Sequence, residues 1–218
     1  WSMDGAVIID KPAGQTSHAI VQAVKKRLGA KKAGHTGTLD PMATGVLPIC
    51  LNEATKLAGF LAAHDKEYRA TMLLGVRTDT LDTEGNVLFR TTQIPNASKI
   101  AHVLFQMIGK IKQIPPAYSA IKHQGKPLYQ WARKGVFPEP SPREVEIFKI
   151  EPEKISPPWV TFRVACSKGT YIRALCADIG EKLGCGACLS SLRRLRCGTF
   201  SENTAIPLDS GKDELFRS

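Results

Sequence analysis

The chain of 218 residues carries 30 Lys and Arg against 20 Asp and Glu, which gives a formal net charge of +10 at pH 7. Hydrophobic residues make up 43 %, enough for a buried core, so global disorder is excluded. The positive excess favours nucleic acid or an anionic membrane surface as partner, although composition leaves a merely soluble basic protein equally open.

The cysteine content and the absence of long apolar segments bear on location. No apolar run approaches the roughly 18 residues that a membrane span requires, and no charged-then-apolar leader opens the chain. Six cysteines in a long chain without a leader favour reduced thiols over a disulfide framework. We therefore expect a cytoplasmic protein with no membrane association.

The first 61 residues alternate strand and helix patterns. Apolar periodicity and turn residues predict, in order, a buried strand, an amphipathic helix, a loop, a second strand and a short helix: residues 6–9, 17–28, 34–41, 45–51 and 53–61. Ser17 is the predicted N-cap of the first helix, and Gly29 ends it. The helix carries a basic run that is either a solvated face or a phosphate contact.

The rest of the chain predicts four strands and two helices: strands at 68–76, 87–93, 145–147 and 160–166, and helices at 100–108 and 169–183. Residues 115–142 hold six of the 14 prolines, and a loop of this length in a compact protein is usually functional or mobile. Without a repeat or a composition break, the elements predict one mixed α+β domain.

Two loops carry candidate catalytic side chains. The segment 34–41, GHTGTLDP, places Asp40 between glycines and a proline, where a carboxylate can be a nucleophile, a general base or a metal ligand. Taken alone, a turn aspartate bonded to its own backbone is the more frequent outcome. Arg173 lies at a predicted helix start and can keep a carboxylate ionised, or it can be an ordinary surface arginine.

Two further features have a functional and a structural interpretation. Tyr68 at a strand end can stack on a flipped base, but most strand aromatics only pack. Cys185 and Cys188 form a single CxxC pair, which is a weak zinc signal without a second pair. We therefore expect no metal.

Eight short motifs, taken together and in order, resemble the bacterial TruB-type family of tRNA pseudouridine-55 synthases. The segments are DKPAGQTS at 10–17, GHTGTLDP at 34–41, ATGVLP at 43–48, KEYRA at 66–70, LGVRTDT at 74–80, PPAYSAIK at 115–122, GTYIR at 169–173 and LRR at 192–194. The resemblance runs from about residue 5 to residue 198. It implies the α+β pseudouridine synthase fold, with a mixed, mostly antiparallel central sheet flanked by helices and loops.

The resemblance implies an isomerase that converts uridine 55 in the T-arm loop of tRNA by base flipping and an aspartate nucleophile. By motif match, Asp40 is the nucleophile, attacking ribose C1′ or base C6. Tyr68 stacks on the uracil and serves in deprotonation at C5, and Arg173 pairs with the aspartate. Tyr171 is the fourth catalytic residue.

The resemblance implies that Lys11 and Pro12 support the site floor. It also implies that His35 contacts the RNA loop and that Leu192 lines the uracil pocket. From the residues themselves we add Gly37, which lets the backbone approach a ligand closely, and Lys122, which can contact phosphate, as substrate-binding residues. The resemblance implies no cofactor and no metal, a tRNA T stem-loop as partner, no obligatory protein partner and a monomer. It also implies a catalytic domain at 3–200 with a mobile RNA-binding loop at 115–142. The tail 201–218 shows none of the PUA-type domain into which bacterial members usually continue.

Two alternatives stay open. One is an RNA-binding or tRNA-folding module whose catalysis is dispensable, which the basic charge and the basic loop also support. The other is guide-RNA-directed modification with partner proteins, as in the related archaeal and eukaryotic enzymes.

Overall fold

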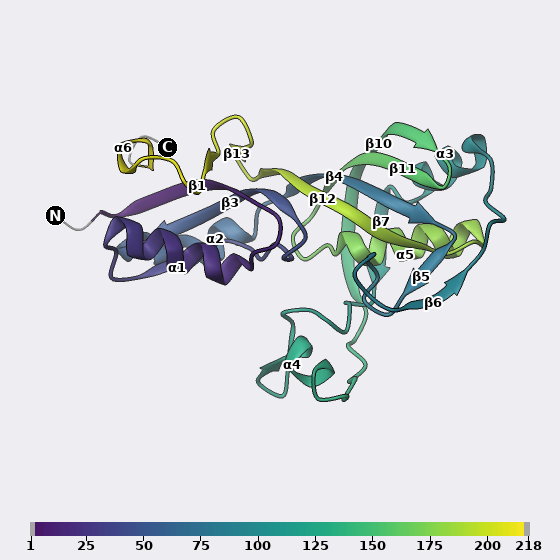
Figure 1. Ribbon diagram of the computed structural model, residues 1–218, viewed down its shortest axis with the longest axis horizontal. Helices are drawn as coiled ribbons and strands as arrows, with labels where there is room; N and C mark the ends of the chain where they lie inside the picture. The colour runs from purple at the N-terminus through teal and green to yellow at the C-terminus, as the bar shows by residue number, and fades with distance from the viewer. Residues whose placement is uncertain (1–2, 216–218) are drawn as a thin grey trace. The chain divides into compact units, whose positions relative to one another are not determined.

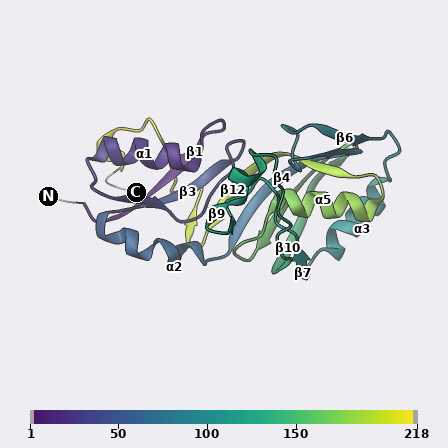
Figure 2. The same ribbon diagram turned by 90° about the horizontal axis from the view of Figure 1, so that it is seen from below.

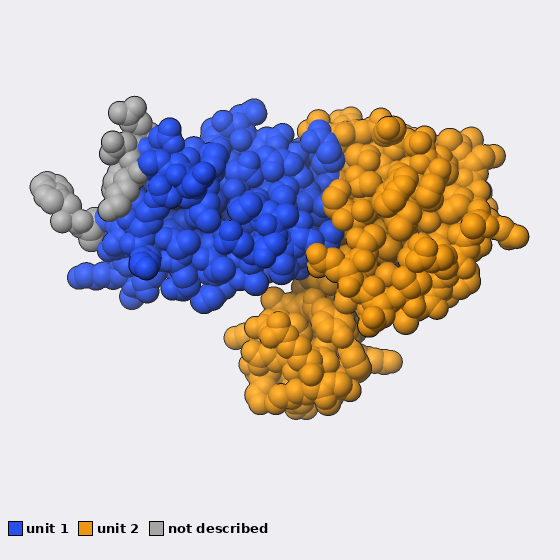
Figure 3. Space-filling model, in the orientation of Figure 1, with its two compact units in different colours: residues 1–69, 192–218 blue, residues 70–191 orange. Residues whose placement is uncertain are grey.

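The computed structural model describes residues 3–215. The chain divides into two compact units, which Figure 3 shows in different colours. Unit 1 comprises the residues up to 69 and from 192 onward, and unit 2 comprises residues 70–191. Strands β4 (Lys66–Leu74) and β12 (Ala187–Cys197) contribute residues to both units.

Unit 1 is built on β1 (Gly5–Lys11) and β3 (Thr44–Leu51), which pair antiparallel along their whole length. The strand order is β14 (Ile206–Pro207), β1, β3, β12, with parallel pairing at β1/β14 and β3/β12. Two further strands join antiparallel, β2 (Ala33–His35) on β3 and β13 (Phe200–Ser201) on β12. The helical elements are α1 (Ser17–Leu28), η1 (Asn52–Leu57), α2 (Ala58–Ala62) and α6 (Lys212–Leu215).

Helix α1 follows from its sequence pattern, with one correction at its start. Thr16, not the expected Ser17, is the N-cap, because the Thr16 hydroxyl accepts a hydrogen bond from the Ala19 N–H at 3.1 Å. Gly29 ends the helix in the left-handed region at φ 65°, as predicted. Figure 2 shows α1 lying beside β1 and β3.

Unit 2 contains a sheet in the order β4, β11 (Trp159–Cys166), β10 (Arg143–Ser156), β7 (Gly109–Gln113). Two hairpins accompany it, β5 (Val76–Thr78) with β6 (Val87–Arg90), and β8 (Lys122–His123) with β9 (Lys126–Pro127). Its helices are α3 (Ala97–Gln106), α4 (Leu128–Ala132) and α5 (Ile172–Leu183) (Figure 1). Helices α3 and α5 contact each other, and α3 packs on β10.

The predicted α+β class with a mixed, mostly antiparallel sheet is confirmed. Strands β7, β12, β13 and β14 and the short helix α6 were not predicted. The segment 115–142, expected as a loop, holds β8, β9 and α4, and the loop expected at 34–41 begins within β2. No helix among residues 3–215 combines the length and the apolar character needed to cross a lipid bilayer. The last three residues of the predicted tail lie outside the described residues.

Candidate active site

Asp40 lies in the loop between β2 and β3, and neighbouring side chains fix the backbone of this loop. The Ser17 hydroxyl, at the start of α1, accepts from the Leu39 N–H and donates to the Leu39 carbonyl, both at 2.9 Å. The Ala43 N–H donates to the Asp40 carbonyl at 2.9 Å. Leu39 is buried and Asp40 is half-buried. The carboxylate therefore projects from a backbone that is held on both sides.

Lys11 forms the floor beneath this loop. Its ammonium is fully buried and donates to the carbonyls of Pro12 at 2.7 Å, Pro41 at 3.1 Å and Ala43 at 2.7 Å. Burial lowers the pKa of Lys11 to about 8, and the charge of Asp40 opposes this effect. An ammonium group has three protons, so Lys11 uses its whole donor capacity here, and two of the three hydrogen bonds hold the loop.

A second basic residue, Arg194 on β12, reaches the same loop. Its Nη2 donates to the Gly37 carbonyl at 3.1 Å, and its Nε donates to the Val46 carbonyl at 2.7 Å. The Gly37 N–H donates to His35 Nδ1 at 3.3 Å. Burial lowers the pKa of His35, and the charges of Arg194 and His18 lower it further. His35 and Gly37 thus belong to one hydrogen-bonded loop with Asp40.

Tyr68 and Leu192 lie on the two strands that enter unit 1, β4 and β12. Their side chains are 7 % and 8 % exposed. Lys66 precedes Tyr68 by two residues on the same face of β4, and its ammonium donates to the carbonyls of Ala62 and His64. Unit 1 therefore contains seven of the predicted site residues: Lys11, Pro12, His35, Gly37, Asp40, Tyr68 and Leu192.

Tyr171 and Arg173 lie at the start of α5 in unit 2, and a buried glutamine fixes the backbone of Tyr171. The Gln113 amide accepts from the Tyr171 N–H at 2.9 Å and donates to the Tyr171 carbonyl at 3.1 Å. The Arg173 side chain is 4 % exposed and donates to the carbonyls of Thr80 at 3.1 Å and Tyr118 at 2.9 Å. Tyr118 belongs to the segment 115–142, so Arg173 ties the start of α5 to that segment.

Lys122 is exposed on β8, within the same segment. Basic and aromatic side chains alternate around it. The Lys126 ammonium lies 5.9 Å from the Trp131 ring centre, and the Arg133 guanidinium lies 5.4 Å from the Tyr129 ring centre. Such surfaces suit nucleic acid, because cations meet phosphates and aromatic rings stack on bases.

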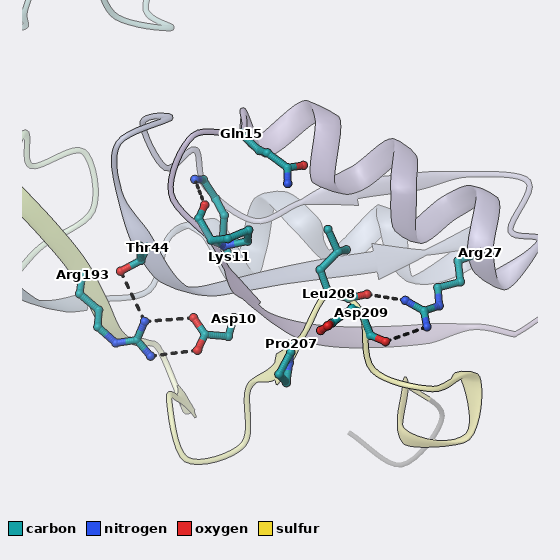
Figure 4. A pocket seen from close by; sticks show the side chains of 10 residues that line it. Asp10, Lys11, Gln15, Arg27, Thr44, Arg193, Pro207, Leu208 and Asp209 are labelled. Atoms are coloured by element: carbon teal, nitrogen blue, oxygen red, sulfur yellow. Dashed lines mark hydrogen bonds and ion pairs between the residues drawn. The ribbon is translucent and has the colours of Figure 1, made fainter. Parts of the chain in front are cut away.

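A hollow of about 630 Å³ opens beside β1 in unit 1 (Figure 4). Arg193 pairs with both carboxylate oxygens of Asp10, at 3.0 and 3.1 Å. Arg27 donates to the carbonyls of Leu208 and Asp209. The hollow includes Lys11 and Pro12 but not Asp40 or Tyr68, so it contains only two of the residues expected at the site.

The cysteines belong to the core. All six are free and buried, and burial raises the pKa of Cys188 to about 11, with a contribution from Asp82. Burial also raises the pKa of Cys185. Within residues 3–215 no group of three or more His, Cys, Asp or Glu side chains is placed to hold a metal ion.

Three residues hydrogen-bond the backbone beside candidate site residues, and sequence reasoning gave none of them a part in the site: Ser17, Gln113 and Arg194. Ser17 was interpreted only as a helix cap. Arg194 was noted only within the LRR motif, and Gln113 lies on a strand that was not predicted. In the sequence, the indication of such a part was that each residue lies inside or beside one of the eight motifs.

Family models and relatives agree with one another. Residues 25–172 match the TruB family pseudouridylate synthase N-terminal domain, and residues 173–217 match the tRNA pseudouridylate synthase B C-terminal domain. The tRNA pseudouridine synthase B of Syntrophus aciditrophicus (strain SB) is 59 % identical over 97 % of this chain and 68 % of the relative. That of Geotalea uraniireducens (strain Rf4) is 51 % identical over 95 % of this chain and 67 % of the relative.

Two solved structures share the fold. A Cbf5-Nop10-Gar1 complex matches with a TM-score of 0.74 and 38 % identity, over 94 % of this chain and 52 % of that chain. An H/ACA RNP bound to a substrate RNA containing 2′-deoxyuridine matches with a TM-score of 0.71 and 35 % identity, over 94 % and 51 %. The chain therefore spans about half the length of these two proteins. The predicted pseudouridine synthase fold is confirmed.

Proposed function

We propose, from the premise that this chain belongs to the TruB family of pseudouridylate synthases, that it converts uridine 55 in the T-arm loop of tRNA to pseudouridine. The relatives named tRNA pseudouridine synthase B support tRNA as the substrate. The net charge of +10 and the basic, aromatic segment 115–142 support an RNA partner.

The observation that carries the proposal is the fixed Asp40 loop. Ser17, Lys11 and Arg194 together hold its backbone from α1, β1 and β12. A nucleophile gains most when it is held in position before the substrate arrives, because the cost in entropy has already been met. An ordinary surface turn would not need hydrogen bonds from a buried lysine and a buried arginine.

The reaction exchanges one glycosidic bond for another. The Asp40 carboxylate attacks either ribose C1′ or base C6, and the bond between uracil N1 and C1′ breaks. The detached base turns, a bond forms between C5 and C1′, and the covalent bond to Asp40 breaks, which restores the carboxylate. C5 then loses its proton, and N1 takes one up. Tyr68 stacks on the flipped uracil, worth about 1–3 kcal/mol, and assists the deprotonation at C5. No oxidant, reductant or cofactor is needed for this balance.

The other residues have supporting roles in the proposal. Arg173 and Tyr171 complete the catalytic set, because both match the GTYIR motif and are fixed at the start of α5. Leu192 lines the uracil pocket, His35 contacts the RNA loop, and Lys122 contacts phosphate. We also propose that the enzyme acts in the cytoplasm as a monomer without an obligatory protein partner.

Tritium release tests the function directly. The substrate is a T-arm transcript labelled with tritium at C5 of uridine, and a transcript with cytidine at position 55 is the matched control. We expect release from the first substrate and none attributable to position 55 from the second. Asp40→Asn should abolish release while RNA affinity stays close to wild type, because the phosphate contacts remain. Wild-type turnover by Asp40→Asn contradicts the assigned nucleophile.

The same assay separates the alternatives. Tight tRNA binding without tritium release supports an RNA-binding or tRNA-folding module. Release that requires added guide RNA and partner proteins supports guided modification, and release by the purified chain on free tRNA excludes it.

A further inference from the structure

Arg194 is a buried cation that no carboxylate neutralises among residues 3–215. Its side chain is 1 % exposed and is among the largest fully buried side chains of the protein. Its hydrogen bonds go to two backbone carbonyls, those of Val46 and Gly37. Burial of a charge without a counter-ion is costly, so a purely structural strand position favours an apolar residue here.

The backbone of Arg194 has no freedom to move away from this place. It pairs with Gly45 in the parallel ladder between β12 and β3. A Cβ atom added at Gly45 would lie 2.2 Å from the Arg194 carbonyl oxygen, so the two backbones are in direct contact. The side chain then runs across β3, is fixed at Val46 through Nε, and ends at Gly37 through Nη2.

Within the Asp40 loop, Gly37 adopts a backbone conformation that other residue types rarely adopt. Its φ of 141° lies in a region that favours glycine, so only its hydrogen bonds hold the peptide in one orientation. Arg194 anchors the Gly37 carbonyl, and Ser17 anchors Leu39 two residues later. These contacts fix the approach of the chain to Asp40.

We propose that Arg194 is a positioning residue that holds the Gly37 end of the Asp40 loop in its reactive orientation. The inference rests on the proposed function, because it assumes that Asp40 attacks the substrate. The planar guanidinium is required, since one group must bond two carbonyls in different directions at once.

The charge of Arg194 has a second, separable effect on the loop. It lowers the pKa of His35, together with burial of the imidazole and the charge of His18. The titration of His35 therefore reports whether a cation still lies at this place. It separates loss of the charge from loss of the guanidinium's hydrogen bonds.

The experiment compares Arg194→Lys, which keeps the charge but loses the fork, with Arg194→Met, which loses both. Arg163→Met on β11 is the control for removing one positive charge, because Arg163 is partly exposed beside Glu153 at 3.8 Å. We measure kcat and KM by tritium release, RNA affinity by filter binding, and the His35 pKa by NMR.

Both Arg194 variants should lose kcat by about 10- to 100-fold, the effect of one charge-assisted hydrogen bond. RNA affinity should change less than about 3-fold, because it is spread over many phosphate contacts. The His35 pKa should rise in Arg194→Met and stay low in Arg194→Lys. Arg163→Met should match wild type in all three measurements.

Wild-type kcat in Arg194→Lys overturns the inference, and so does a loss of affinity equal to the loss of kcat. If Arg194→Met does not fold, Arg194→Lys with its melting temperature decides alone. If the wild-type protein releases no tritium, the proposed function fails instead. The backbone amide shifts of residues 37–40 in Arg194→Lys then decide the positioning role, and unchanged shifts overturn it.

Discussion

Replacement of Lys11 by methionine removes the floor of the Asp40 loop while keeping an unbranched side chain of similar length. Three carbonyl oxygens lose a hydrogen bond, those of Pro12, Pro41 and Ala43. The Pro41 carbonyl keeps a second donor, the Gly14 N–H at 2.7 Å. All three lie at partly or fully buried places, so water replaces the ammonium only in part. The variant thus tests whether these hydrogen bonds contribute to the stability of the folded protein.

The size of the effect follows from two opposing contributions. Each buried acceptor left without a donor costs about 1–3 kcal/mol, so the carbonyls of Pro12 and Ala43 cost roughly 4 kcal/mol. The Pro41 carbonyl loses one of two donors, which costs about 1 kcal/mol more. The variant also escapes the cost of burying a charge. The fall of the Lys11 pKa from its ordinary 10.5 to about 8 corresponds to about 3 kcal/mol. We therefore expect Lys11→Met to be less stable by about 2 kcal/mol at pH 7.

The difference should depend on pH in a direction that the pKa fixes. Because the pKa of Lys11 is lower in the folded protein, the unfolded chain binds more protons between about pH 8 and 10.5. Wild-type stability from this group therefore rises with pH through that window, and the variant lacks the rise. The gap should grow to about 4 kcal/mol at pH 10.

Urea unfolding followed by circular dichroism at pH 7, 8, 9 and 10 measures the gap, and titrations common to both proteins cancel. Lys149→Met on β10 is the control, because Lys149 is 64 % exposed beside Glu151. Its stability difference should stay within about 0.5 kcal/mol at every pH. A gap for Lys11→Met that is flat or shrinks from pH 7 to 10 refutes the reasoning.

Three other outcomes follow from the geometry. Gly37→Ala should lower the free energy of unfolding in urea by about 1–2 kcal/mol, because φ is 141° there and alanine is strained in that conformation. The added Cβ atom meets nothing closer than 3.7 Å, so the loss comes from the backbone, and an unchanged stability would contradict the strain. Gln113→Leu should lower kcat more than RNA affinity, since the Tyr171 backbone loses both of its hydrogen bonds to the Gln113 amide; equal losses would point to misfolding. Cys188, with a pKa of about 11, should resist a thiol reagent at pH 8 until urea unfolds the protein; rapid labelling of the folded protein would show that it is accessible.

The sequence by itself determined the class of the protein and most of its helices. Periodicity located α1, α3 and α5, and alternation located β4 and β11, because these signals are local and repeat within one element. The motifs identified the family, because eight short segments in a fixed order match it. Asp40 itself was visible because its loop combines glycines, a carboxylate and a proline.

Tertiary structure decided what surrounds Asp40. β12 escaped prediction because Arg193 and Arg194 are adjacent, so the pattern no longer alternates between apolar and polar residues. Arg194 is buried only because β3 supplies carbonyl acceptors from residues far away in the sequence. The lowered pKa of Lys11 and the two hydrogen bonds of Gln113 have the same origin. Desolvation and hydrogen bonding depend on neighbours that the chain brings together only when it folds, and no local pattern encodes them.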